Sequence, residues 1–292
     1  MNEEHRRYLM EGEQTGARFT LAAPRRVPTG ISGIRLGNRI GSSLEFRDHR
    51  EYQAGDDLRR IDWNAFARTD KLILKLYQEE VSPHLDLVID GSCSMALEGS
   101  AKLEVTLGLA AVLAVAAANA GFSHSTWVAG EVCRRVEGGS DRPALWEGLS
   151  FDHHGDLAES FVRLRPPWRR QGIRILLSDL LWLGDPLLTL QHLSRDSSSV
   201  VVVQILARAD ADPPDRGNVR LIDSETEQTR EIFLDDVSVR RYKESLGRHR
   251  DNWQLACRQT GAVMTTMLAE DTAADWELED LVASEILGIS NK

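Results

Sequence analysis

The sequence predicts an α/β protein with a doubly wound, mostly parallel sheet and a small N-terminal β-rich unit. Two observations lead to this fold class. Apolar strand-like segments alternate with longer helix-like segments from about residue 81 onward. The strands are continuously apolar, as in the four valines of residues 200–203, which is typical of parallel strands covered on both faces. The length of 292 residues accommodates two domains, which we place at residues 1–80 and 81–292.

The elements of the larger domain are delimited by glycine, proline and helix-capping residues. The first apolar strand ends at Asp90, and a later one ends at the pair Ser178-Asp179. We expect strands at residues 85–89, 122–128, 173–177, 200–206 and 263–268, the last being the final strand, helices at residues 101–120, 156–165, 237–260 and 276–286, and a β-hairpin at residues 219–234.

The composition indicates a protein that folds in water, with 42% hydrophobic and 27% charged residues. The net charge of -10 opposes binding to a nucleic-acid backbone, so we expect no nucleic-acid partner. The longest apolar stretch, Leu107–Ala120, is shorter than the roughly 18 residues of a membrane span, and we interpret it as a buried helix. The N-terminus lacks the apolar core of a signal peptide. We therefore expect a cytoplasmic protein without a membrane span.

The loop after the first apolar strand carries Asp90, Ser92 and Ser94. In parallel sheets, ligands bind at the carboxyl ends of the strands. One carboxylate and two hydroxyls at alternate positions point the same way, and hard cations such as Mg²⁺ or Mn²⁺ take oxygen ligands. We therefore predict a divalent cation site to which Asp179, and additionally Ser178, contribute from another strand. The alternative is that the two serines bond to backbone amides while Asp90 forms an Asx-turn.

The segment Asp90-Gly91-Ser92-Cys93-Ser94-Met95 resembles the metal-ion-dependent adhesion site of von Willebrand factor type A domains, whose motif is D-x-S-x-S. The resemblance implies a von Willebrand factor type A-like fold, and it assigns the last ligand of the motif to Asp179. The family also uses a threonine, at whose position this chain has Gly155. Glycine offers no side-chain oxygen, so an empty, degenerate site is an alternative. Asp156 is an additional candidate ligand. The alternative is that its carboxylate caps the helix that follows.

Residues 50–68 resemble the hallmark of the bacterial family called domain of unknown function 58, which runs R-x-Y-x-x-G-D-D-x-R-x-I-D-W-x-x-x-A-R. The resemblance covers residues 35–180 well. It implies that the protein works with a MoxR-type AAA+ ATPase in assembling, folding or activating client proteins, and it brings no catalytic activity. The site residues that carry it are Arg50, Tyr52, Asp56, Asp57, Arg59, Asp62, Trp63 and Arg68.

Arginine binds carboxylates through two parallel hydrogen bonds and stacks on aromatic rings. The segment at residues 50–68 therefore allows an ion-pair network that locks the small unit onto the main domain. A partner-docking surface and a catalytic role are the two alternatives.

Three functions remain open from the sequence. The first is a non-enzymatic protein-binding module that uses the loop at Asp90. The second is a metal-dependent hydrolase that uses Asp90 and Asp179 with His153 or His154. The third is a metal-free scaffold. The sequence has neither a phosphate-binding loop nor the G-x-S-x-G elbow of serine hydrolases, so nucleotide hydrolysis and serine hydrolysis are not expected.

Overall fold

The structure is a computed structural model that describes residues 2–22, 44–53, 56, 61–79, 83–213, 216–223 and 228–290. The chain forms two compact units, one made of Met1–Val27 with Pro83–Lys292 and the other of Pro28–Ser82. This division differs from the predicted boundary at residue 80, because helix α1 (Glu3–Gly16) belongs to the larger unit. A side chain at Gly12 would collide with the backbone of Gly108, so glycine allows α1 to pack directly on helix α3 (Lys102–Asn119).

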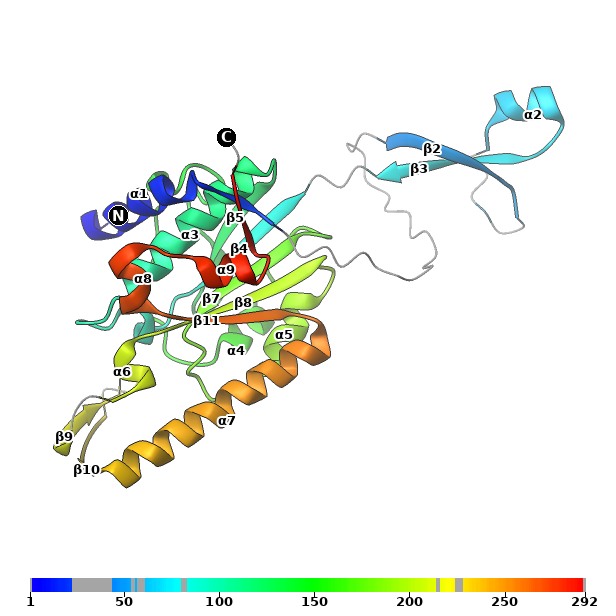
Figure 1. The fold of residues 1–292 in the computed structure, drawn as a ribbon. Coiled ribbons are helices and arrows are strands. Elements are labelled where there is room, and N and C mark those ends of the chain that lie inside the picture. Colours follow the sequence, from blue (N-terminus) through cyan, green and yellow to red (C-terminus); the bar gives the residue numbers. More distant parts are fainter. Residues whose placement is uncertain are drawn as a thin grey trace. The chain divides into compact units, whose positions relative to one another are not determined.

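Within the described residues, the larger unit contains a six-stranded sheet in the order β11-β8-β7-β4-β5-β6. All neighbours are parallel except β5 and β6, which confirms the predicted α/β class with a mostly parallel sheet (Figure 1). The strands are β4 (His84–Asp90), β5 (Ser123–Ala129), β6 (Cys133–Arg135), β7 (Ile173–Ser178), β8 (Ser199–Leu206) and β11 (Val263–Leu268).

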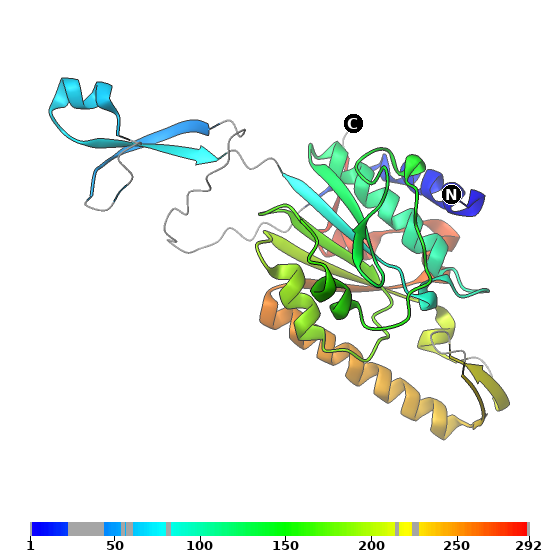
Figure 2. The same ribbon diagram turned by 180° about the vertical axis from the view of Figure 1, so that it is seen from behind.

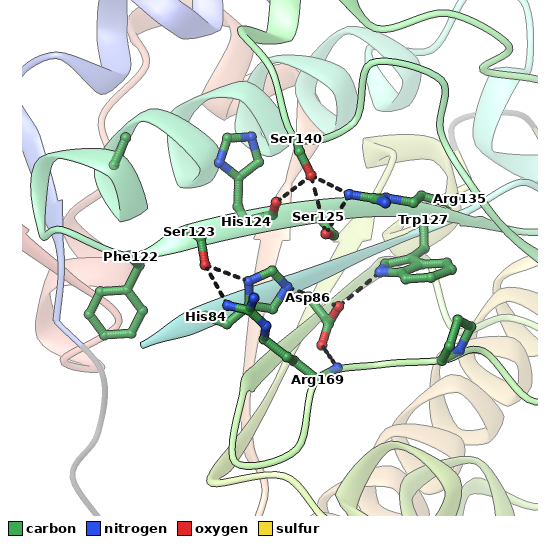
Figure 3. A pocket seen from close by; sticks show the side chains of 12 residues that line it. His84, Asp86, Phe122, Ser123, His124, Ser125, Trp127, Arg135, Ser140 and Arg169 are labelled. Carbon is green, nitrogen blue, oxygen red and sulfur yellow. Dashed lines mark hydrogen bonds and ion pairs between the residues drawn. The ribbon is translucent and has the colours of Figure 1, made fainter. Parts of the chain in front are cut away.

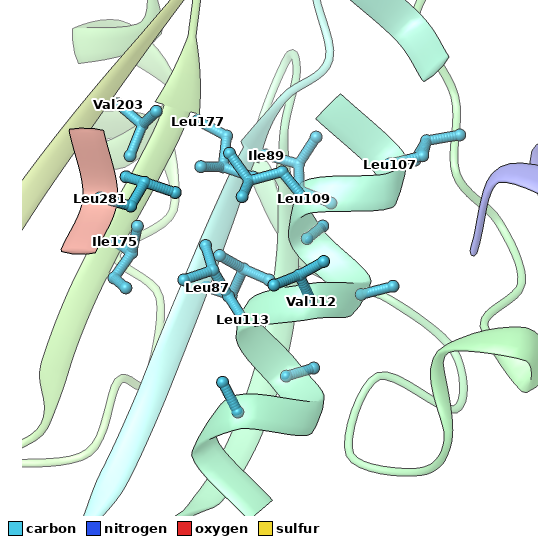
Figure 4. Close-up of a cluster of buried hydrophobic side chains, with 14 of the residues drawn as sticks. Leu87, Ile89, Leu107, Leu109, Val112, Leu113, Ile175, Leu177, Val203 and Leu281 are labelled. Carbon is cyan, nitrogen blue, oxygen red and sulfur yellow. The ribbon is translucent and has the colours of Figure 1, made fainter. Parts of the chain in front are cut away.

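Helices cover both faces of this sheet (Figures 1 and 2). Successive residues of a strand point to opposite faces, so Leu87 and Ile89 pack against α3 while Val88 joins the cluster on the other face. Figure 4 shows the first cluster, in which α3 side chains meet those of β4, β7 and β8. The second face is covered by α4 (Leu157–Arg163), α5 (Pro186–Ser194) and α7 (Asp236–Thr260).

Helix α3 is the predicted buried helix. Among the described helices it alone is long and apolar enough to cross a membrane by length and composition, and 72% of its residues are buried inside the protein. Its apolar character on all sides is explained by contacts with α1, the sheet and α8 (Ala269–Asp275).

The C-terminal end differs from the sequence prediction. Instead of one helix at residues 276–286, the structure has α8 and a short α9 (Glu279–Ala283), with Trp276 between them at a left-handed φ of 53°. The Trp276 ring fills the space that Gly108 leaves on α3, and this packing ends α8. Strand β11 is also not the last strand, because β12 (Leu287–Ile289) pairs with β1 (Phe19–Leu21) near the N-terminus.

The remaining elements of the larger unit lie in the connections between the strands of this sheet. The predicted hairpin at residues 219–234 is confirmed as antiparallel strands β9 and β10. The elements in these connections are the 3₁₀ helices η2 (Cys93–Ala96) and η3 (Pro143–Leu145), α6 (Arg208–Ala211), β9 (Gly217–Ile222) and β10 (Thr229–Leu234).

The smaller unit contains an antiparallel pair, β2 (Leu44–Glu51) and β3 (Ile73–Glu79), with α2 (Trp63–Thr69) in the connection between them. The Asp62 carboxylate accepts hydrogen bonds from the backbone N–H groups of Asn64 and Ala65, which fixes the start of α2.

Candidate functional site

Two neighbouring strands bring the predicted carboxylates together at the carboxyl edge of the sheet. Strand β4 ends at Asp90, and its neighbour β7 ends at Ser178 with Ile89 opposite Leu177. The Ser178 hydroxyl donates to Asp90 Oδ2 at 2.6 Å. The aspartates therefore meet because their strands are adjacent and in register.

The loop after β4 folds its polar groups inward. The backbone N–H of Ser92 donates to Asp90 Oδ1 at 2.9 Å, which is the Asx-turn that the sequence allowed as an alternative. The hydroxyls of Ser92 and Ser94 lie 3.1 Å apart, and Ser92 makes no side-chain cap for the short helix η2. Asp90 is fully buried. The loop thus collects one carboxylate and two hydroxyls, and one carboxylate oxygen already accepts from the backbone.

A second loop runs beside the first one. The backbone N–H of His153 donates to the Gly91 carbonyl, and the N–H of Cys93 donates to the His153 carbonyl. The threonine position of the adhesion motif therefore lies next to the Asp90 loop. Gly155 has a φ of 136°, which β-branched residues such as threonine rarely adopt, so the backbone itself favours glycine here.

Asp156 acts as a helix cap in this structure. Its carboxylate accepts from the backbone N–H of Ala158 at 2.7 Å, at the start of α4. The same carboxylate packs so closely on Gly184 that a side chain at residue 184 would collide with it. The structure thus shows Asp156 in the role of the N-cap.

The two histidines of this loop, His153 and His154, have different surroundings. The buried Nε2 of His153 has no hydrogen-bond partner among the described residues, and burial lowers the pKa of this ring below its ordinary value. The His154 ring lies 3.6 Å from Cys93 Sγ. In the described part of the chain, neither ring hydrogen-bonds to Asp90 or Asp179.

A buried lysine is the largest feature that the sequence prediction missed. Lys102 Nζ lies 3.0 Å from Asp179 Oδ2 and 3.1 Å from Asp210 Oδ2, and the lysine is fully buried. The other oxygen of Asp179 accepts from the backbone N–H of Leu181 at 3.1 Å. Asp179 is therefore the partner of an internal cation.

The charged groups at this edge shift one another's pKa values. Burial, with the negative charge of Asp179 as the second cause, raises the pKa of Asp90 to about 7. Burial alone would lower the pKa of Lys102, but the charges of Asp179 and Asp210 outweigh it and raise the pKa of this ammonium group. Lys102 is therefore charged at neutral pH, whereas Asp90 is near its midpoint.

The sequence contained signals for both missed residues. Lys102 lies in the first turn of α3, where the helix dipole disfavours a cation, so a local carboxylate partner was to be expected. Asp210 follows β8, the strand next to β7, so the rule about carboxyl ends of strands also points to it.

The donor chemistry at Asp90 fits a hard divalent cation. Asp90, Ser92 and Ser94 offer oxygen ligands from one loop. When all groups are ionised, the three carboxylates and Lys102 leave two negative charges at this edge. Among the described residues there is no cluster of three or more His, Cys, Asp or Glu side chains that could hold a metal ion. Any cation here would therefore depend on the serine hydroxyls.

The segment at residues 50–68 lies in the smaller unit. Arg50 Nη2 lies 2.6 Å from Asp56 Oδ1, and this hydrogen bond to Arg50 is the main cause that lowers the pKa of Asp56. The Asp56 carboxylate also accepts from the backbone N–H of Gln53. Asp57 and Arg59 lie outside the described residues.

The other residues of this segment have local roles. Asp62 caps α2, and the Tyr52 backbone N–H donates to the Leu72 carbonyl. Arg68 is exposed and donates to the Asn64 carbonyl. Trp63 is 61% exposed and contacts Phe66 edge to face. Within the described residues of this unit, the segment thus contains the ion pair between Arg50 and Asp56 and the exposed ring of Trp63.

The sequence matches the family described as "Protein of unknown function DUF58" over residues 48–252. An uncharacterized protein of Mycobacterium tuberculosis and one of Mycobacterium bovis are each 28% identical over 264 residues, covering 86% of this chain and 82% of theirs. An uncharacterized protein of Mycobacterium avium is 32% identical over 130 residues, covering 44% of this chain and 73% of its own.

Two solved structures resemble parts of this chain at low scores. The conserved hypothetical protein BatB from Bacteroides thetaiotaomicron has a TM-score of 0.34 at 10% identity, covering 69% of this chain and 98% of its own. An aerotolerance-related membrane protein from Bacteroides fragilis has a TM-score of 0.34 at 12% identity, with 68% and 98% covered.

Proposed function

The chain belongs to the DUF58 family, and we propose that it is a non-enzymatic protein-binding module with a von Willebrand factor type A-like fold. The observation that carries this proposal is the convergence of Asp90, Ser92 and Ser94 in one loop at the carboxyl edge of a parallel sheet. This is the edge at which open α/β sheets bind their ligands.

In this proposal Asp90, Ser92 and Ser94 hold a divalent cation, Mg²⁺ or Mn²⁺. A bound cation supplies a positive charge that accepts a carboxylate of the partner protein. Ser178 orients Asp90 through its 2.6 Å hydrogen bond. Lys102 pairs with Asp179 and keeps this second carboxylate in place beside Asp90, so that its negative charge also attracts the cation.

Exposed leucines beside this edge support a protein-binding surface. Leu183, in the loop that follows β7, is 98% exposed, and Leu97, just after η2, is 41% exposed. The neighbouring Trp182 is buried against Trp253, so the loop itself is anchored. Exposed apolar side chains on an anchored loop are typical of sites that become buried in a complex.

The partner in this proposal is a MoxR-type AAA+ ATPase, and together they assemble, fold or activate a client protein. The resemblance of residues 50–68 to the family hallmark is the basis for this partner. A metal-free scaffold is the second candidate, and Lys102 is the observation that favours it. The Lys102 ammonium group already neutralises part of the negative charge of Asp179 and Asp210, which a bound cation would otherwise balance.

A capture experiment with a purified MoxR-type ATPase from the same source tests the proposal. The immobilised full chain is expected to retain the ATPase in Mg²⁺ and to release it in a chelator. Asp90→Ala and Leu183→Ser are each expected to reduce retention. The matched control is Leu255→Ser, which changes a half-exposed leucine near the C-terminal end of α7, the end that leads into the start of β11 at the opposite edge of the sheet.

The possible outcomes separate the two candidates. Retention that neither the chelator nor Asp90→Ala changes would select the metal-free scaffold. No retention of the ATPase by the wild-type chain, with or without Mg²⁺, would contradict the proposed partner.

A further inference from the structure

The opposite edge of the same sheet contains a cavity of about 650 Å³, which is within the size range of small-molecule sites. Its floor is formed by the first residues of two neighbouring strands, His84 on β4 and Ser123 on β5. Residues from β6, from the loop at residue 140 and from the loop at residue 169 complete its walls (Figure 3).

Two arginines bring positive charge to this cavity in a chain whose net charge is -10. Arg135 donates to the hydroxyls of Ser125 and Ser140, and Arg169 Nη1 donates to Ser123 Oγ at 3.2 Å. Among the described residues, neither guanidinium group pairs with a carboxylate. Each guanidinium has five N–H donors, so both retain donors that these hydroxyls do not use.

The one carboxylate in the cavity wall is already satisfied. Asp86 is 1% exposed and accepts from Trp127 Nε1 at 3.0 Å and from the backbone N–H of Arg169 at 3.1 Å. His84 Nε2 lies 3.4 Å from the same carboxylate. Asp86 therefore accepts from other donors than the two guanidinium groups, which can bind a ligand instead (Figure 3).

The other polar features of the cavity do not remove this positive charge. Burial lowers the pKa of His124, so this ring is neutral at neutral pH. Helix α3 ends beside the cavity, but its last carbonyls accept from the backbone N–H groups of residues 120–122, which reduces their effect on an anion.

The chain Ser123–His84–Asp86 has the order of a nucleophilic triad, but its geometry does not fit one. Ser123 Oγ lies 2.8 Å from His84 Nδ1, whereas His84 Nε2 is 3.4 Å from Asp86 Oδ1, longer than the roughly 2.6–3.2 Å that orients a catalytic base. In the cavity, this series of contacts holds the Ser123 hydroxyl in place.

We propose that this cavity binds a small molecule through a phosphate group, with Arg135 and Arg169 as its main donors. Guanidinium groups match the oxygens of a phosphate in geometry and charge. The hydroxyls of Ser123 and Ser140 accept hydrogen bonds from the two guanidinium groups and hold them at the cavity wall. A phosphate has three acceptor oxygens and up to two negative charges, so it uses two guanidinium groups better than a carboxylate does. The half-buried Phe122 ring lines the cavity and supplies an apolar wall for the body of the ligand.

The test is a ligand-observed nuclear magnetic resonance titration of the full chain with phenyl phosphate, in the presence of a chelator. Phenol and benzoate serve as probes that lack the phosphate. Saturable binding is expected for phenyl phosphate, with a dissociation constant on the order of 1 mM for a ligand of this size. Phenol is expected to show none, and benzoate is expected to bind at least several-fold more weakly.

Arg135→Gln and Arg169→Gln are each expected to weaken binding by about tenfold or more, because each loses charged hydrogen bonds. Arg134→Gln is the matched control on the same strand, since its guanidinium donates to the Gly148 carbonyl and to Ser150. Asp90→Ala is expected to bind phenyl phosphate like the wild type, which separates this cavity from the cation site. Among the described residues, the Arg135 guanidinium donates only to hydroxyls, whereas the backbone of Arg169 also binds buried Asp86. Arg135→Gln therefore decides the question if Arg169→Gln fails to fold.

Three outcomes would overturn the proposal. They are the absence of saturable phenyl phosphate binding, binding that survives both arginine substitutions, and binding of phenol or benzoate that equals that of phenyl phosphate.

Discussion

At the carboxyl edge of the sheet, Asp179 and Asp210 share the fully buried ammonium group of Lys102, and a third carboxylate, Asp90, is close enough to feel the charge of Asp179. At the amino edge, one buried carboxylate, Asp86, is surrounded by donors while two arginines remain at the wall of an open cavity. The same strands therefore end in a negatively charged edge on one side and in a positively charged cavity on the other. A cation and an anion are the ligands that complement these two ends.

The difference also concerns what each edge contributes to stability. A buried ion pair is costly to break, because removal of one partner leaves the other charge without compensation. The arginines at the amino edge are exposed to water and contribute little when changed. Substitutions at the two edges should therefore differ in their effect on unfolding, and this difference can be measured.

The largest effect is expected for Lys102→Met. It leaves Asp179 buried without its cation and should lower the free energy of unfolding by about 3–5 kcal/mol. Urea unfolding measures this loss. Arg163→Met is the control, because Arg163 is half-exposed and pairs with exposed Glu131 and Glu159, so its loss should stay under about 1 kcal/mol. Equal losses in the two variants would contradict the assignment of Lys102 as a structural cation.

A smaller, pH-dependent effect is expected for Asp90→Asn in chelator-treated protein. The pKa of Asp90 is raised from 3.8 to about 7, so its stabilising contribution is fully present below pH 3.8 and is lost as the pH rises through about 7. Asparagine does not ionise and should therefore gain stability relative to the wild type between pH 4 and pH 8, by on the order of 3 kcal/mol. Thermal unfolding at both pH values measures this gain, and a difference that does not change with pH would disprove the raised pKa.

The smallest effect is expected at the amino edge for Trp127→Phe. This change removes the hydrogen bond to buried Asp86 and should cost about 1.5 kcal/mol beyond the loss of packing. Trp182→Phe is the matched control, because its buried indole N–H has no hydrogen-bond partner among the described residues. If both variants lose the same stability, Trp127 does not support Asp86.

The fold followed from the sequence because its strands are continuously apolar and its helices have clear ends. Residues 173–177 were predicted as a strand, and β7 covers Ile173–Ser178. The predicted helix at residues 276–286 failed because Trp276 packs on α3, a contact between positions far apart in the sequence. Local patterns cannot show which residue will fill the space above a glycine on another helix.

The site was predictable in part for a similar reason. Asp90 and Asp179 follow apolar strands, and those strands proved to be neighbours. Lys102 was missed because its place in the first turn of a helix indicates a carboxylate partner, but the sequence alone does not show which carboxylates reach it or that the lysine is buried. The amino-edge cavity was missed entirely, because its lining comes from separate segments that only the tertiary structure brings together.

The proposed function depends on a divalent cation in the Asp90 loop. Isothermal titration of chelator-treated protein with Mg²⁺ and with Mn²⁺, at pH 8 where Asp90 is ionised, tests it most directly. The wild type is expected to bind one cation saturably, and Asp90→Ala is expected to abolish this binding. No saturable heat with the wild type, or binding that persists in Asp90→Ala, would contradict it.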